Sequence, residues 1–151
     1  MRVLYTARSP KPDADRDLKA RRVELDQLLT ESDFVAVHTD LNAETKGLFG
    51  ADAFRRMKPT AVFVNTSRGP VVDQGALAEA LRSGTIFAAG LDVTDPEPLP
   101  PDHELYSLPN CVIAPHIASA TVHTRNEMAR ICAENLIAGL TGGRLTACVN
   151  G

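Results

Sequence analysis

Short apolar runs alternate with amphipathic stretches along the chain. The runs predict strands, with a very short additional strand at Val23–Leu25. The clear runs are Arg2–Thr6, Phe34–His38, Ala61–Asn65, Ile86–Leu91 and Val112–Ala114. They are apolar at successive positions rather than at every second one, which is typical of strands buried on both faces of a parallel sheet.

The stretches between these runs predict helices. Residues 13–21 are strongly charged and form at most a turn or two of helix. Asp26 is a predicted N-cap for a short helix, and Asp73 for a longer one that ends before Gly84. The predicted helices are Gln27–Glu31, Ala51–Met57, Gln74–Arg82 and a long one from about Thr121 to near Gly139. Strands that alternate with helices predict an α/β fold.

Polar clusters follow the predicted strands. In an open parallel sheet, ligands bind outside the carboxyl ends of the strands, and the clusters fall at these ends. They are Arg8-Ser9, Thr39-Asp40, Thr66-Ser67-Arg68, Asp92 and His116. Taken singly, each has an ordinary explanation as a solvated arginine, a capping aspartate or a loop histidine. Five clusters on one edge predict a binding site.

Three of the side chains suggest a reaction class. Arg68 offers a planar fork of donors that suits a carboxylate, and His116 can give or take a proton near neutral pH. Glu97 stands between two prolines, and it would orient the imidazole of His116 if the two are in contact. This set suits the interconversion of a 2-hydroxy acid and a 2-oxo acid, with a nicotinamide as hydride carrier.

Composition excludes several other classes. The net charge of −3 argues against nonspecific nucleic-acid binding, and no apolar run approaches the roughly 20 residues of a membrane helix. The three cysteines form no C-x-x-C pair, which favours a reducing compartment, the cytoplasm. His116 and His123 have no third ligand nearby in sequence, so no metal site is predicted.

Three longer motifs carry a resemblance. "NTSRGPVVD", "GLDVTDPEPLP" and "NCVIAPHIASAT" resemble the signatures of D-2-hydroxyacid dehydrogenases, in that family's order and close to its spacing. The resemblance covers nearly the whole chain. The stretch "LDVTDPEPLPPDHELYSLPNCVIAPHIASAT" is most similar to the glyoxylate/hydroxypyruvate reductase branch.

The resemblance implies roles for residues near the substrate. Arg68 would bind the substrate carboxylate and polarise the keto group. His116, backed by Glu97, would protonate the keto oxygen, and Ser119 would lie near the substrate. The implied substrate is a small 2-oxo or 2-hydroxy acid. A homo-oligomer is predicted as the assembly.

The resemblance also implies cofactor contacts. Asp92 would hold the nicotinamide carboxamide, while the backbone of Thr66 and Ala118 would line the nicotinamide pocket. Asp40 stands where most members carry a proline, which places a carboxylate near the expected path of the adenosine.

The end of the first predicted strand bears on the choice of cofactor. NAD-specific dinucleotide folds carry Asp or Glu at the end of the second strand, where the ribose hydroxyls bind. Here the strand continues into Arg8, Ser9, Pro10 and Lys11, with no acid before Asp13. These groups suit the 2′-phosphate, so NADP(H) is predicted to be preferred over NAD(H). Taken alone, "RSPK" would be read as a basic surface loop.

The glycine-rich loop of the family has no counterpart in this sequence, because no G-x-G occurs among its ten glycines. We therefore predict an incomplete doubly wound, Rossmann-type parallel sheet that lacks its first strand, with unpaired edges beside the gap. Residues 1–120 would form an incomplete dinucleotide-binding domain, and residues 121–151 a long helix and tail leading toward a missing substrate domain. A nonenzymatic dinucleotide-sensing protein and an inert fragment remain alternatives.

Overall fold

A computed structural model of the chain describes residues 1–148. The described residues form two compact units, Met1–Pro115 and a second unit that begins at His116. The domain boundary predicted between residues 120 and 121 concerns a longer enzyme and stays a prediction.

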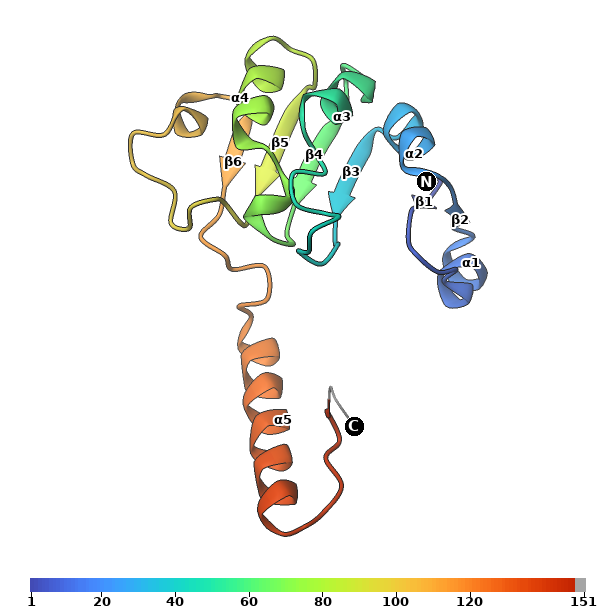
Figure 1. Ribbon diagram of the computed structural model, residues 1–151, viewed down its shortest axis with the longest axis vertical. Coiled ribbons are helices and arrows are strands. Elements are labelled where there is room, and N and C mark those ends of the chain that lie inside the picture. The colour runs from blue at the N-terminus through green and yellow to red at the C-terminus, as the bar shows by residue number, and fades with distance from the viewer. Residues whose placement is uncertain (149–151) are drawn as a thin grey trace. The chain divides into compact units, whose positions relative to one another are not determined.

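The first unit is built on a four-stranded parallel sheet (Figure 1). The order of the strands is β3-β4-β5-β6, which follows the order of the chain. In register, Val35 lies opposite Phe63, and Phe63 lies opposite Ala89. The strands are β3 (Phe34–Val37), β4 (Val62–Asn65), β5 (Ala88–Leu91) and β6 (Cys111–Ile113). The α/β class and the parallel sheet predicted from the sequence are confirmed.

The first two strands form a separate parallel pair, which Figure 1 shows apart from the larger sheet. β1 (Leu4–Tyr5) and β2 (Arg21–Arg22) are joined by helix α1 (Pro12–Leu18). Among residues 1–148, neither strand pairs with β3. The predicted gap in the doubly wound sheet is therefore present between β1 and β3.

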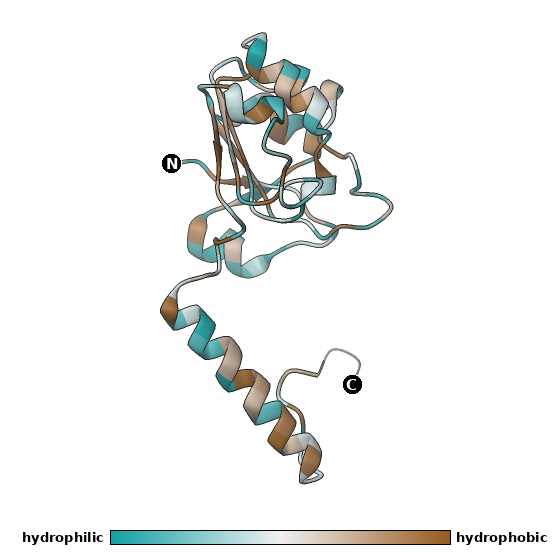
Figure 2. Cartoon of the chain, turned by 90° about the vertical axis from the view of Figure 1, so that its left-hand side faces the viewer, coloured by the Kyte–Doolittle hydropathy of each residue, from teal (hydrophilic) through white to brown (hydrophobic). Residues whose placement is uncertain are grey.

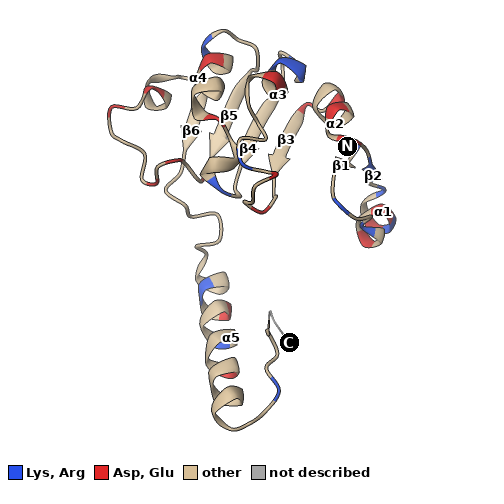
Figure 3. Ribbon diagram, in the orientation of Figure 1, with Lys and Arg blue, Asp and Glu red and all other residues tan. Residues whose placement is uncertain are grey.

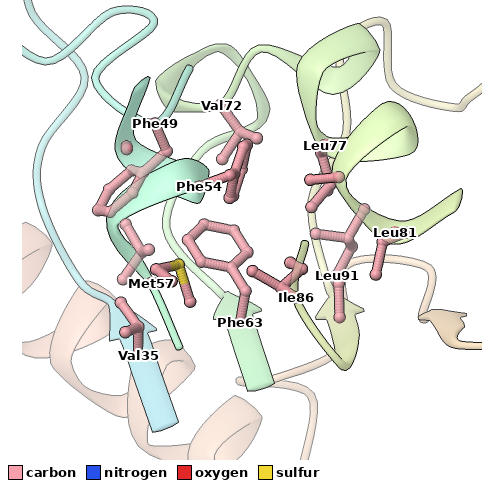
Figure 4. Close-up of a cluster of buried hydrophobic side chains, with 14 of the residues drawn as sticks. Val35, Phe49, Phe54, Met57, Phe63, Val72, Leu77, Leu81, Ile86 and Leu91 are labelled. Carbon is pink, nitrogen blue, oxygen red and sulfur yellow. The ribbon is translucent and has the colours of Figure 1, made fainter. Parts of the chain in front are cut away.

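Three helices cover one face of the four-stranded sheet. They are α2 (Leu25–Glu31), α3 (Ala51–Arg56) and α4 (Gln74–Arg82), and α3 packs against both of the others. Figure 4 shows the core between these helices and the sheet, centred on Phe63. The ring of Phe63 meets that of Phe54 edge-on at a centroid distance of 5.3 Å. This face of the sheet is well packed and positions the strand ends.

Short 3-10 helices complete the first unit: η1 (Gly69–Val71) after β4, and η2 (Glu104–Ser107) before β6. The second unit contains the long helix α5 (Val122–Leu140). Thr121 is its N-cap, and the Thr121 side chain accepts a hydrogen bond from the backbone N–H of Thr124. Apolar and polar residues are mixed along α5 in Figure 2, and acidic and basic residues are interspersed on it in Figure 3.

Two local predictions were wrong. The strand predicted at Val23–Leu25 lies earlier, at Arg21–Arg22, and Leu25 already begins α2. Both residues of this strand are arginines, so the apolar pattern gave no signal for it. The N-cap of α2 is Glu24 rather than Asp26, because the helix begins at Leu25, two residues earlier than predicted.

Candidate functional site

The turn after β4 is fixed by Asn65. Its side chain is 1 % exposed and donates from Nδ2 to the backbone carbonyl of Arg68 at 3.0 Å. Its Oδ1 accepts from the backbone N–H and the hydroxyl of Ser67, at 3.0 and 2.9 Å. An asparagine that bonds the backbone two and three residues ahead imposes a tight turn on it. The backbone of Ser67 and Arg68 is therefore held rigidly at the carboxyl end of the strand.

Arg68 itself is exposed at this edge. Its Nη1 donates to the carbonyl of Ser67 at 2.6 Å, which leaves the other side of the guanidinium fork directed away from that bond. A hollow of about 360 Å³ lies beside it, lined by residues 38–41 after β3 and 66–68 after β4. The hydroxyl of Thr66 and Nδ1 of His38 approach within 3.5 Å across the two strand ends.

The loop that carries Glu97 packs against the Arg68 turn. Gly69 lies so close to this loop that a Cβ added to it would be 1.9 Å from the carbonyl oxygen of Thr94. The side chain of Gln74 holds the loop through two hydrogen bonds to the backbone of Asp95. Its Nε2 donates to the carbonyl of Asp95 at 2.5 Å, and its Oε1 accepts from the N–H of Asp95 at 2.9 Å. The structure thus brings the segments of Arg68 and Glu97 together within the first unit.

Glu97 also takes part in the structure of its own loop. Its Oε2 accepts a hydrogen bond from the backbone N–H of Thr94 at 3.2 Å. The hydroxyl of Thr94 donates to the carbonyl of Pro96 at 2.9 Å. The loop is therefore ordered by local bonds, and the carboxylate of Glu97 has a fixed position relative to β5.

Asp92 comes directly after β5, and its side chain is 7 % exposed. Its backbone N–H donates to the carbonyl of Asn65 at 2.9 Å, which continues the β4–β5 ladder to the edge of the sheet. Asp92, Thr66 and Arg68 therefore follow neighbouring parallel strands at the same edge. This is the arrangement that the sequence predicts for these three residues.

The segment after β1 is exposed and basic. Arg8, Ser9, Pro10 and Lys11 are exposed, and the side chain of Arg22 holds the start of this segment by donating to the carbonyl of Ala7 at 2.7 Å. The backbone N–H of Lys11 donates to the hydroxyl of Tyr5 at 2.9 Å.

Arg8 forms an ion pair with Asp40. Nη2 of Arg8 lies 3.6 Å from Oδ2 of Asp40, and the two side chains are 84 and 83 % exposed. The pair joins the end of β1 to the end of β3. The acidic residue that departs from the family's usual proline is therefore a partner of the arginine predicted to bind the 2′-phosphate.

His116, Ala118 and Ser119 belong to the second unit, in the segment between β6 and α5. All three are exposed. His116 adopts a left-handed backbone conformation with φ 54°, which is uncommon for a residue other than glycine. A backbone N–H of this segment, that of Ala120, donates to the carbonyl of Ile117 at 2.9 Å and closes a turn. The predicted contact between His116 and Glu97 stays a prediction.

Sequence reasoning missed several residues that build the site. Asn65, Gly69, Gln74 and Arg22 hold the functional loops rather than contact a ligand. A signal existed for Asn65, since an asparagine followed two residues later by serine is typical of an Asx turn. None existed for Gln74 or Arg22, whose partners lie 21 and 15 residues away in the chain.

The part of the chain that is described, residues 1–148, contains no cluster of three or more His, Cys, Asp or Glu residues able to hold a metal ion. Within the same residues, no helix has both the length and the apolar character needed to cross a membrane.

The residues at this edge fit the two ends of a dinucleotide. The segment after β1 offers basic side chains, and the ends of β4 and β5 offer polar groups. The sequence has no G-x-G turn for the pyrophosphate between them. The chain thus holds groups for part of a dinucleotide site.

Comparison with known proteins decides the family. Residues 1–118 match the family model "D-isomer specific 2-hydroxyacid dehydrogenase, NAD binding domain". The chain belongs to this family. The resemblance predicted from its motifs is confirmed, and the family indicates a nicotinamide dinucleotide as the cofactor.

Relatives and solved structures agree with this membership. The chain is 55% identical over 141 residues to a glyoxylate reductase/hydroxypyruvate reductase of Mus musculus, covering 93% of this chain and 43% of that protein. It superposes on the TT0316 protein of Thermus thermophilus with a TM-score of 0.91 and 51% identity, covering 99% of this chain and 46% of that one.

A D-lactate dehydrogenase solved with NAD+, from Lactobacillus jensenii, gives a TM-score of 0.92 at 30% identity, covering 99% of this chain and 48% of that one. The chain therefore spans less than half the length of the relatives it matches. The incomplete Rossmann-type fold predicted from the sequence is consistent with this partial coverage.

Proposed function

We propose that this chain is the part of an oxidoreductase that carries its catalytic residues. The intact enzyme reduces glyoxylate- and hydroxypyruvate-type 2-oxo acids to D-2-hydroxy acids with NADPH. The names of the mouse relative and of several bacterial ones support this substrate class. The motifs that contain Arg68, Glu97 and His116 support the reaction.

The observation that carries the proposal is the construction around Arg68. A buried asparagine fixes the backbone on both sides of the turn, and Gly69 joins it to the loop of Glu97. An ordinary surface arginine needs no such support. A guanidinium carried by a fixed backbone at the ligand-binding edge of a parallel sheet is suited to bind a carboxylate.

The chemistry divides among these residues. When bound, the nicotinamide supplies a hydride to the keto carbon of the substrate. Arg68 binds the carboxylate through its paired donors and polarises the keto group. His116 donates its proton to the keto oxygen as that oxygen becomes a hydroxyl, and Glu97 favours the protonated imidazole. Ser119 lies near the substrate, and the backbone of Thr66 and Ala118 with the side chain of Asp92 holds the nicotinamide.

The preference for NADPH rests on the segment after β1. Arg8 and Lys11 are exposed and carry two positive charges, and Ser9 adds a hydroxyl, so this segment would suit a phosphorylated ribose. Pro10 restricts the backbone between them. The cytoplasmic location and the homo-oligomeric assembly stay predictions.

The test is substrate-dependent oxidation of NADPH by the intact enzyme. Arg68→Ala raises KM for glyoxylate and lowers kcat, because the fork both binds the carboxylate and polarises the keto group. Arg55→Ala, which removes an equal charge from α3, leaves both constants unchanged. An intact protein that binds NADPH and turns over neither 2-oxo acid would instead establish the dinucleotide-sensing alternative.

A further inference from the structure

Two side chains of the β1–β2 pair hold the segment that follows β1. Tyr5 lies opposite Arg22 in the register of the pair, so the two side chains stand on the same face of it. The hydroxyl of Tyr5 accepts from the backbone N–H of Lys11 at 2.9 Å. The guanidinium of Arg22 donates to the beginning of the segment, at Ala7 and Arg8. The segment is therefore held at both of its ends from one face of the strand pair.

Arg22 makes three hydrogen bonds to two consecutive carbonyls. Its Nε and Nη2 donate to the carbonyl of Ala7 at 3.0 and 2.7 Å, and its Nη2 also donates to the carbonyl of Arg8 at 3.3 Å. A lysine cannot reproduce this pattern, because a single ammonium has no planar fork of donors. The two carbonyls lie 15 and 14 residues before Arg22 in the chain, so the contact is tertiary and not part of a local turn.

These bonds decide where the other sides of the two peptide groups point. The peptide bonds Ala7–Arg8 and Arg8–Ser9 are trans, and in a trans peptide the carbonyl and the N–H point in opposite directions. Because Arg22 holds both carbonyls, the N–H groups of Arg8 and Ser9 point away from it. Within residues 1–148, neither of these N–H groups donates a hydrogen bond. Successive backbone N–H groups presented in this way are suited to bind an anion.

The charges around the segment also favour an anion. Arg8, Lys11 and Arg22 bring three positive charges to it, and Asp40 brings one carboxylate, 3.6 Å from Arg8. Figure 3 shows basic residues both after β1 and on β2. The guanidinium of Arg22 points at backbone carbonyls, whose partial negative charge would otherwise repel an anion. Arg22 therefore changes which backbone groups the segment presents, in addition to its charge.

We propose that Arg22 is a positioning residue for the phosphorylated ribose of the cofactor. It turns the carbonyls of Ala7 and Arg8 away, and it thereby presents the N–H groups of Arg8 and Ser9 to the 2′-phosphate together with the side chains of Arg8 and Lys11. Arg22 itself does not touch the phosphate. The inference rests on the NADPH preference proposed above, and it adds that a residue of the neighbouring strand prepares the segment for that phosphate.

The test compares the binding of NADPH and of NADH to the intact enzyme and to its Arg22→Gln variant. Glutamine removes both the fork and the charge. The dissociation constant of NADPH rises about five- to thirtyfold, the cost of fixing the backbone of one residue on binding. The dissociation constant of NADH stays nearly unchanged, because NADH carries no 2′-phosphate. At saturating NADPH the variant keeps its kcat, since the substitution leaves the reacting end of the cofactor untouched.

Two further variants separate the fork from the charge. Arg21→Gln is the matched control, because it removes an equal charge from the next residue of β2, whose side chain pairs with Glu31 at 3.7 Å. It leaves the ratio of the two dissociation constants unchanged. Arg22→Lys keeps the charge without the fork, and it loses most of the NADPH preference that Arg22→Gln loses. The loss persists near 1 M salt, where a screening length of about 3 Å would remove an effect of charge alone.

Hydrogen exchange in the unmutated enzyme measures the backbone groups directly. The amide hydrogens of Arg8 and Ser9 become protected when NADPH binds, and they stay unprotected when NADH binds. Equal exchange of these two amides in both complexes would overturn the proposal without any substitution.

The other outcomes are equally decisive. Equal weakening of NADPH and NADH by Arg22→Gln, with a lower midpoint of thermal unfolding, would show a merely structural role and overturn the proposal. An unchanged cofactor ratio in Arg22→Lys would overturn it as well, because the charge alone would then suffice. A clear NADPH preference that survives Arg22→Gln would overturn only the role of Arg22. Equal binding of NADPH and NADH by the unmutated enzyme would overturn the proposed cofactor preference, and this inference with it.

Discussion

The ion pair between Arg8 and Asp40 leads to a test of the cofactor preference that we propose. Asp40→Asn keeps the size of the side chain and removes its charge. In the intact enzyme, we expect this variant to bind NADPH more tightly and to bind NADH as before. Arg8 would then meet the 2′-phosphate without a competing carboxylate, and the phosphate would no longer be repelled.

The structure sets the size of the effect. Both side chains are more than 80 % exposed and 3.6 Å apart, and such exposed pairs contribute about 0.2–1 kcal/mol. Releasing Arg8 from the pair therefore tightens NADPH binding by at most about fivefold. Charge-assisted bonds to the phosphate are worth about 1.5–3 kcal/mol each, so Arg8→Ala weakens NADPH binding by at least about tenfold.

The assay is the ratio of kcat/KM for NADPH to that for NADH, at low and high salt. The gain from Asp40→Asn disappears near 1 M salt, where the screening length is about 3 Å. In the Arg8→Ala background the gain is smaller, because only the repulsion remains to be relieved. Asp52→Asn, which removes an ion-paired carboxylate of similar exposure from α3, changes nothing. An unchanged cofactor ratio in Arg8→Ala would refute the assignment of the phosphate site.

Three further predictions concern the loops and the core. His116→Ala in the intact enzyme lowers turnover by about 10²–10⁴ while NADPH binding persists, and near-normal turnover would exclude it as the general acid. Gly69→Ala lowers the midpoint of thermal unfolding and raises KM, because the added Cβ would collide with the carbonyl of Thr94. The control is Gly75→Ala, where the nearest atom to an added Cβ is 3.4 Å away. Equal effects of the two substitutions would contradict this packing. Burial raises the pKa of the Cys111 thiol from 9.0 to about 11, so the folded state loses stability as the pH rises from about 9 to about 11. Cys111→Ala would remove that loss, and an unchanged pH profile would contradict it.

The sequence predicted the sheet well because its signal is local. The run Ala61–Asn65 is apolar at each position but the last. Such a continuous apolar run is typical of a strand that is buried on both faces of a parallel sheet. The same logic placed Arg68, Asp92 and Asp40 at one edge, since parallel strands end together. Element type and edge position follow from pattern and topology alone.

The features that the sequence did not predict depend on partners far away in the chain. β2 consists of two arginines, and it is a strand only because β1 supplies the carbonyls of Val3 and Tyr5. The Arg8–Asp40 pair joins residues 32 positions apart, which no local pattern reveals. The sequence placed an unusual acid near the expected cofactor path, and only the fold shows that this acid forms an ion pair with Arg8.

The residues beside Arg68 explain how a charged residue can follow the buried strand β4. Asn65 ends β4 by turning its side chain onto the backbone that follows, so the carbonyl of Arg68 and the N–H of Ser67 are satisfied without a further strand. Gly69 then permits contact with Thr94 that any side chain would prevent. Between these two fixed points Arg68 has little backbone freedom, and its side chain alone projects outward. The fixed backbone removes one part of the entropy cost of the carboxylate binding that we propose for Arg68.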